Sequence, residues 1–243
     1  MRVNINGLIS EIQHKAQLES ELQQSKLLLK ESQLISLQSQ INPHFLFNTL
    51  DTLSKKAYLD GSEETSDLIA NVADLLRYNL RRLDRAVTLA EELSVTLKYI
   101  EIQSARFTDR LTFVQQIDSS CLQLKLPCLT LQPLIENAVI HAVEPLEDGG
   151  TIFLRIYGVE ERVVIEVEDT GTGMGEDKVR HILAEGGAPE TQGHSTGIGF
   201  INVVKRLRLY FGEEDIIAIT SAPGEGTKIT IKIPNVRSTA LHA

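Results

Sequence analysis

The segment 41–50, Ile-Asn-Pro-His-Phe-Leu-Phe-Asn-Thr-Leu, places a histidine where it can react. On a helix, His44 and Asn48 lie one turn apart on a polar face. An apolar stripe follows the helical spacing on roughly the opposite side, through Leu46, Leu50, Leu53 and Ala57. A neutral imidazole, with a reference pKa of about 6.5, is a nucleophile at neutral pH. The alternative is an ordinary surface or core histidine, so the rest of the chain must decide.

Pro43, directly before His44, is compatible with two backbone arrangements. It is either the first residue of a new helix with Asn42 as its N-cap, or a kink in a continuous helix. In both cases the backbone around His44 is irregular, because proline lacks the N–H of a helical hydrogen bond.

Two glycine motifs in the second half suit a nucleotide. Asp-Thr-Gly-Thr-Gly at 169–173 follows a β-rich run, where an acid can accept a hydrogen bond from an exocyclic amine. Gly-His-Ser-Thr-Gly-Ile-Gly at 193–199 opens a helix, whose N–H groups and positive dipole end suit a phosphate. Each motif is weak alone, because such turns and helix starts are common.

An apolar helix expected between the His44 segment and the two glycine motifs carries Glu136 and Asn137 side by side. Asn137 could ligate a hard cation through its carbonyl oxygen, and His141 lies one turn further on the same face. The alternative is a buried asparagine that caps a neighbouring element.

Composition restricts the functions open to the chain. Of its 243 residues 42% are hydrophobic and 23% charged, and the net charge is −9, which argues against binding nucleic acid or anionic lipid. The two cysteines, Cys121 and Cys128, have no metal-ligand spacing. No run approaches the ~20 apolar residues of a membrane span, and no signal peptide is recognised. We therefore expect a cytoplasmic protein.

The first hundred residues predict helices. Residues 5–40 favour a long helix that pairs with its copy in a coiled coil, or else a solvated helix. Asp60 and Glu63 resemble a capping box before an amphipathic helix over 68–83. Two such helices from each of two chains would close a four-helix bundle. Thr88 and Glu91 form a capping box for a third helix, which runs to about Phe107.

From about residue 111 strands alternate with helices. Strands are predicted over 111–117, 151–157, 162–168, 215–221 and 227–233, and helices over 129–143, 177–185 and 198–211. A glycine-rich loop spans 170–196. We predict an α+β protein in which a coiled coil and a helical hairpin precede an α/β sandwich with its helices on one sheet face.

The order of the motifs resembles the ATP-binding domain of the histidine kinase, Hsp90, gyrase and MutL superfamily, called the Bergerat fold. The order is an asparagine helix, Asp-x-Gly-x-Gly, a Gly-x-Gly helix and then Gly226-Thr227, and no P-loop motif is found. Residues 37–48 resemble the phosphoacceptor signature of LytS/YesM-type bacterial sensor histidine kinases. Further similar segments are Tyr99, 106–111, 131–138 and 197–207.

This resemblance implies a homodimeric kinase that moves the γ-phosphoryl of ATP to His44 and then to an aspartate of a response regulator. It implies that Asn137 holds Mg²⁺, that Asp169 binds the adenine amino group and that Thr227 supports the adenine. The remaining nucleotide-binding positions would be His141, Gly171, Gly173, Gly197, Gly199, Asn202 and Arg206.

Many histidine kinases place an acid directly after the phosphoacceptor, whereas this chain has Phe45 there. We take Glu136 as the candidate base, because it adjoins Asn137. Asn48 is a candidate to orient a water that dephosphorylates the regulator.

The expected domains are a signalling helix over 1–40, dimerisation and phosphotransfer helices over 41–110, an ATP-binding domain over 111–235 and a tail over 236–243. Contact with a membrane would come only through an upstream receptor segment. The alternatives are an ATP-gated binding or scaffold module in which His44 is structural, and a superfamily ATPase or serine kinase.

Overall fold

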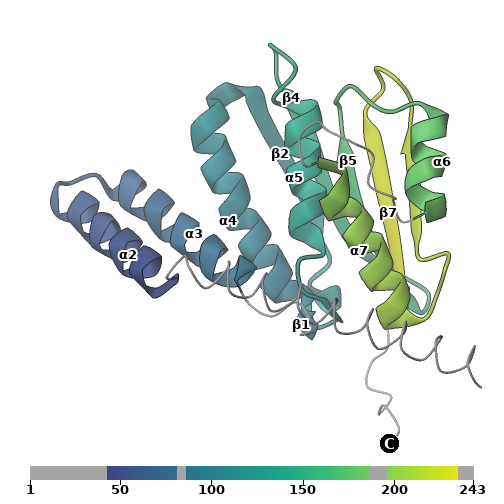
Figure 1. The fold of residues 1–243 in the computed structure, drawn as a ribbon, viewed down its shortest axis with the longest axis horizontal. Coiled ribbons are helices and arrows are strands. Elements are labelled where there is room, and N and C mark those ends of the chain that lie inside the picture. Colours follow the sequence, from purple (N-terminus) through teal and green to yellow (C-terminus); the bar gives the residue numbers. More distant parts are fainter. Residues whose placement is uncertain (1–42, 81–85, 186–195, 235–243) are drawn as a thin grey trace, which may run out of the picture. The chain divides into compact units, whose positions relative to one another are not determined.

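The computed structural model describes residues 43–80, 86–185 and 196–234 (Figure 1). The predicted coiled coil, Asn42 and the tail lie outside the described residues. The chain divides into two compact units, residues 1–52 and 53–243. Among the described helices, none combines the length and the apolar character needed to cross a membrane.

Helix α2 (Pro43–Leu59) runs unbroken past His44. The hydroxyl of Thr49 donates to the carbonyl of Phe45 at 2.8 Å, and that of Thr52 donates to the carbonyl of Asn48 at 2.7 Å. None of its side chains is buried, and Phe45 is 66% exposed. A helix with an apolar stripe and no buried side chain has a face available for a partner.

Helix α3 (Glu63–Asn79) follows a turn at Gly61, whose φ is +80°. Its N-cap is Ser62, and no side chain caps it, so the predicted capping box of Asp60 and Glu63 is wrong. Asp60 instead pairs with Lys56 at 2.5 Å, because the two residues lie one turn apart on the end of α2.

Helix α4 (Leu89–Phe107) begins with the predicted capping box. The N–H of Glu91 donates to the hydroxyl of Thr88 at 3.2 Å, and the N–H of Thr88 donates to the Glu91 carboxylate at 2.9 Å. Strand β1 (Ala86–Thr88) leads into this cap and pairs antiparallel with β3 (Lys125–Pro127). This two-stranded sheet was not predicted, since strands of three residues carry almost no periodicity.

A five-stranded sheet forms the rest of the second unit, in the order β2-β4-β5-β7-β6. The β2–β4 pair is parallel and the other three pairs are antiparallel. The predicted strands are confirmed as β2 (Leu111–Ile117), β4 (Gly150–Val159), β5 (Arg162–Asp169), β6 (Ile217–Ser221) and β7 (Thr227–Pro234). Short 3₁₀ turns, Thr108–Arg110 and Ser119–Cys121, flank β2.

Helices α5 (Leu131–Ala142) and α7 (Thr196–Phe211) lie on the same side of this sheet, and α6 (Glu176–Glu185) lies beside β6 (Figure 1). Alternate residues of the central strands point into the layer between the sheet and these helices. They include Ile152, Leu154, Ile165 and Ile231, which are all fully buried. Each such side chain stabilises the fold by about 1.5–3 kcal/mol. The predicted α/β sandwich is confirmed.

Candidate functional site

A pocket of about 130 Å³ opens between α5, the ends of β5 and β7, and the start of α6. It brings together five of the predicted nucleotide-binding residues: Asn137, His141, Asp169, Gly173 and Thr227. Its other walls are mainly apolar, from Leu134, Ala138, Val167, Met174, Ile182, Phe200, Ile219 and Ile229. An apolar slot with a few convergent polar groups suits a flat heterocycle with polar edges.

Asp169 is the last residue of β5 and lies opposite Thr227 of β7 in the sheet register. It is only 7% exposed, and its carboxylate accepts the N–H of Gly171 at 2.9 Å. Burial raises the pKa of Asp169, and backbone N–H groups of Gly171 and Thr227 partly oppose that rise. A fixed, buried acceptor of this kind can select a ligand that brings an amine to it.

Glycines let the backbone pass close to the pocket. A Cβ at Gly171 would lie 2.4 Å from the carbonyl oxygen of His141. Gly173 has φ +65°, and a Cβ there would lie 1.9 Å from the carbonyl oxygen of Ala222. Side chains are therefore excluded at both positions of the Asp-x-Gly-x-Gly motif, which explains its spacing.

The hydroxyl of Ser221 holds Thr227 in place in the wall of the pocket. It donates to the carbonyl of Gly226 at 2.8 Å and accepts the N–H of Met174 at 2.8 Å. Because the single proton of Ser221 is used in this way, the Thr227 hydroxyl, 3.0 Å distant, must donate to Ser221. The oxygen of Thr227 then remains an acceptor toward a ligand.

Asn137 and His141 reach the pocket from one face of α5, one turn apart. Burial, and then the charge of Lys178, lower the pKa of His141, so its ring is neutral at pH 7. The described residues contain no group of three or more His, Cys, Asp or Glu side chains that could hold a metal. The Asn137 amide oxygen fits Mg²⁺, which keeps several waters and binds substrate phosphates.

The remaining predicted residues on α5 and α7 do not line this pocket. The Glu136 carboxylate accepts from the amide of Gln132 at 2.7 Å, and burial raises its pKa. Asn202 is exposed, and Arg206 donates to the carbonyl of Leu129 at 2.5 Å. Gly197 and Gly199 lie in the first turn of α7. Their predicted roles toward a nucleotide stay predictions.

His44 and Asn48 lie together on the exposed side of α2. The amide nitrogen of Asn48 is 3.3 Å from Nδ1 of His44. The helix thus presents an imidazole to solvent with an amide beside it, as its spacing predicted.

Sequence reasoning missed several residues of the pocket, among them Met174, Lys178 and Phe200. Met174 directly follows Gly173, and Phe200 directly follows Gly199. Adjacency to the two glycine motifs is the signal that could have found them. Lys178 lies in α6 and has no such signal.

Fold and pocket together define a nucleotide-binding protein of the Bergerat kind, and comparisons with known proteins agree. The family model for histidine kinase-, DNA gyrase B- and HSP90-like ATPases matches residues 127–237, and the model for histidine kinases matches residues 32–111. Together the two matches span most of the chain. The chain belongs to the histidine kinases of the LytS/YesM type.

Curated relatives carry the same family name. The sensor histidine kinase YesM of Bacillus subtilis (strain 168) is 36% identical over 218 residues, covering 90% of this chain and 36% of the relative. The sensor histidine kinase YpdA of Escherichia coli (strain K12) is 35% identical over 240 residues, covering 98% of this chain and 40% of the relative. The chain thus spans less than half the length of these relatives.

Among solved structures, the catalytic domain of the histidine kinase ThkA is 17% identical. The match covers 62% of this chain and 95% of that chain, with a TM-score of 0.46.

Proposed function

We propose that this chain is an ATP-dependent protein histidine kinase. It binds Mg-ATP in the pocket beside α5, transfers the γ-phosphoryl group to His44 and passes it to an aspartate of a response-regulator receiver domain. The observation that carries the proposal is the presence, on one chain, of a pocket closed by the buried Asp169 and of the exposed His44. Membership of the histidine kinase family supports both halves.

Within the pocket each residue has one task. The Asp169 carboxylate accepts a hydrogen bond from the adenine amine, and the Thr227 oxygen accepts a second one. Neutral His141 and the apolar walls of the pocket enclose the adenine ring. Asn137 would hold Mg²⁺ through its amide oxygen, and the bound ion would neutralise phosphate charge during transfer.

At His44 a ring nitrogen donates its lone pair to the γ-phosphorus. A nitrogen–phosphorus bond forms while the bond from the γ-phosphorus to the bridging oxygen breaks, and ADP leaves with that electron pair. In the second step a receiver aspartate oxygen takes the phosphoryl group and the imidazole leaves. The exposure of His44 serves both steps, since nucleotide and regulator must reach the same atom in turn.

The exposed apolar residues of α2 support a homodimer. We propose that α2 and α3 pair with a second copy in a four-helix bundle, because a lone hairpin would leave Phe45, Leu53 and Leu59 in water. On this proposal residues 41–110 dimerise and carry the acceptor, and 111–235 bind ATP. The kinase works in the cytoplasm, by itself or as the inner part of a membrane receptor.

The test is to incubate the purified chain with Mg²⁺ and γ-labelled ATP, beside His44→Gln. We expect acid-labile, base-stable label on the wild type and no label on the variant. The nucleotide Kd of the variant should stay within twofold of the wild type, since His44 lies outside the pocket. Nucleotide binding without label on either protein would contradict the kinase and favour an ATP-gated binding module.

Glu136 is our candidate for the base that takes the His44 proton. Its pKa is raised by burial, and a stronger base accepts a proton more readily. Glu136→Gln should bind ATP normally and label His44 at least tenfold more slowly. A variant that labels at the wild-type rate would eliminate this role.

A further inference from the structure

Glu92 of α4 is a buried acid that no step proposed so far uses. It is 1% exposed, and its carboxylate accepts four hydrogen bonds. Three come from consecutive backbone N–H groups, those of Leu129 at 2.6 Å and of Thr130 and Leu131 at 2.8 Å each. The fourth comes from the hydroxyl of Tyr78 in α3.

The three N–H groups belong to the start of α5. Thr130, the N-cap of this helix, makes no side-chain cap, because its hydroxyl donates to the carbonyl of Pro127 at 2.6 Å. Leu129 has φ +56°, a left-handed conformation that turns its N–H toward the same point as the next two. Glu92 therefore supplies the cap that α5 lacks, and it does so from another helix.

The same peptide also connects to α7. The carbonyl of Leu129 accepts from the guanidinium of Arg206 at 2.5 Å. Helix α5 carries Asn137 and His141, and α7 carries Phe200, all of which line the nucleotide pocket. A displacement of Glu92 would thus move the starting point of one pocket helix and a contact of the second.

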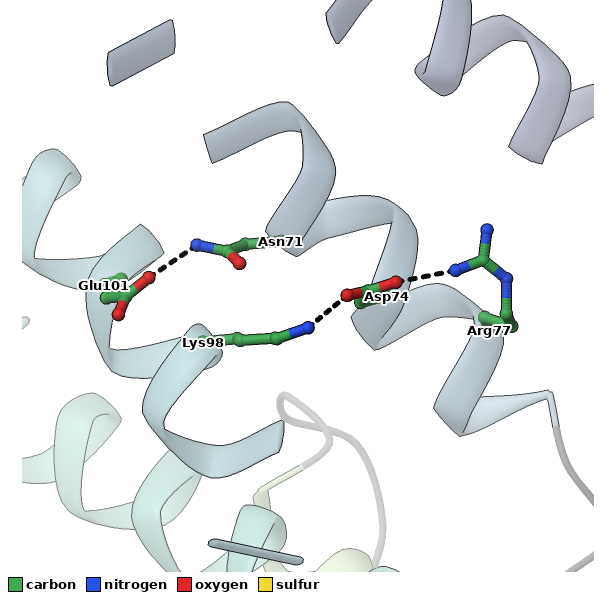
Figure 2. Close-up of polar contacts among 5 residues, drawn as sticks. All are labelled: Asn71, Asp74, Arg77, Lys98 and Glu101. Carbon is green, nitrogen blue, oxygen red and sulfur yellow. Dashed lines mark hydrogen bonds and ion pairs between the residues drawn. The ribbon is translucent and has the colours of Figure 1, made fainter. Parts of the chain in front are cut away.

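Tyr78 is the buried polar link between this cluster and α3. Its hydroxyl is held in the protonated form, because burial and the neighbouring Glu92 raise the pKa of Tyr78. Two further polar links between α3 and α4 are more exposed (Figure 2): Lys98 pairs with Asp74, and Asn71 donates to Glu101 at 2.6 Å. Ion pairs and hydrogen bonds that water can reach contribute little, so these links hold α3 against α4 only weakly.

We propose that the Tyr78–Glu92 hydrogen bond couples the position of α3 to the start of α5, which makes Tyr78 and Glu92 positioning residues for phosphotransfer. The bond can break while the three backbone bonds to Glu92 remain, so α3 can shift without unfolding the pocket. By reciprocity, a nucleotide that steadies α5 must also steady α3. This inference rests on the proposed kinase function only for its effect on the labelling of His44.

The first measurement compares Tyr78→Phe with the wild type in nucleotide Kd and in the initial rate of His44 labelling at saturating Mg-ATP. We expect a Kd within twofold and a labelling rate at least threefold lower, since α3 then occupies positions unsuited to transfer. Glu92→Gln should instead raise the Kd at least fivefold, because the start of α5 loses its charged acceptor. Tyr78→Phe that labels at the wild-type rate would overturn the proposal.

Two controls separate coupling from general loosening. Tyr210→Phe removes the same hydroxyl from an exposed tyrosine of α7, and Lys98→Met removes a partly exposed link between α3 and α4. Both should label within twofold of the wild type. Slowing by Lys98→Met equal to that by Tyr78→Phe would show that any weakening of the α3–α4 contact suffices, against the proposal.

The second measurement does not depend on kinase activity. Amide hydrogen exchange over residues 63–79 is followed with and without Mg-ATP. The wild type should exchange more slowly in α3 when nucleotide is bound, and Tyr78→Phe should show no such change at equal occupancy. If the exchange rate of α3 in the wild type does not change when nucleotide binds, the coupling is overturned, even if neither protein is labelled at His44.

Discussion

The pocket and helix α2 differ in how far their functional residues are exposed to solvent. In the pocket Asp169 is 7% exposed, Thr227 is 9% exposed, and backbone approach at Gly171 and Gly173 leaves no room for a side chain. In α2 no residue is buried, and His44 has a one-turn amide neighbour on an exposed face. One region is determined by distant parts of the chain, and the other by its own helical repeat.

This difference follows from what each region must recognise. A nucleotide is selected by groups that cannot move, because a displaced acceptor would lose its discrimination between amine and carbonyl. An acceptor histidine must meet two reagents in succession, so enclosure would exclude one of them. We therefore expect pocket substitutions to change nucleotide affinity and α2 substitutions to leave that affinity unchanged.

The largest effect should come from Gly226, in the loop before β7. Its φ is +78°, and a Cβ would lie 1.9 Å from the carbonyl oxygen of Asp169. Gly226→Ala should abolish measurable nucleotide binding and lower the free energy of unfolding by at least about 3 kcal/mol. Gly224 is the matched control, because it has φ +82° but no atom within 4 Å of its Cβ position. Gly224→Ala should cost about 1–2 kcal/mol and bind nucleotide normally.

Asp169→Asn should separate recognition from stability. The variant keeps the shape of the side chain but loses a charged hydrogen bond to the amine, so the ATP Kd should rise about tenfold or more. Because burial raises the pKa of Asp169, a neutral amide should not lower the free energy of unfolding. Glu168→Gln is the control, since Glu168 pairs with Arg155 at 2.6 Å outside the pocket. Equal affinity loss in both variants would refute the assignment.

His141 should make a smaller, pH-dependent contribution. Its folded pKa is lowered below the unfolded value of about 6.5, so in this range the unfolded chain binds the extra proton. The free energy of unfolding should therefore fall as pH drops from about 6.5 toward the lowered pKa and become flat below it. His141→Gln should remove this part of the slope in denaturant titrations, and the two proteins should run parallel above pH 7.5. A slope that survives unchanged would exclude His141 as its source.

Asn48→Ala tests the other side of the comparison and should have the smallest effect. On an exposed helix the change should alter the free energy of unfolding by no more than about 0.5 kcal/mol. Nucleotide Kd and the rate of His44 labelling should remain within twofold of the wild type. If Asn48 orients a water, the variant should dephosphorylate its regulator more slowly. A change in nucleotide affinity would contradict the separation between α2 and the pocket.

Sequence reasoning succeeded where local signals decide the structure. Strands β4 and β7 alternate in burial, the Thr88 capping box forms as predicted, and Asp169 and Thr227 meet because strand ends carry them. It failed at Asp60, where Ser62 is the N-cap and the Asp60 carboxylate lies within reach of Lys56. A capping motif fixes a helix start only when no nearer partner competes for the carboxylate.

The residues that sequence reasoning missed are placed by long-range packing. Glu92 sits in a charged helix, and its three backbone donors lie 37 to 39 residues further along the chain. No local motif marks Glu92, whereas the neighbouring Glu91 belongs to the Thr88 capping box of its own helix. Lys178 likewise reaches the pocket only because α6 lies beside the sheet. Such positions follow from the assembled fold and not from periodicity.

The sheet order also has a consequence for how the chain is made. β7 lies between β5 and β6 although it is the last of the described strands in sequence, and its Ile229, Ile231 and Ile233 are buried. During synthesis the edge of β5 that pairs with β7 therefore remains unpaired until residue 234 has left the ribosome. Over that interval the growing chain exposes a template for intermolecular pairing. Premature termination before β7 should thus yield an aggregating fragment, and chaperones would be needed most until β7 has been synthesised.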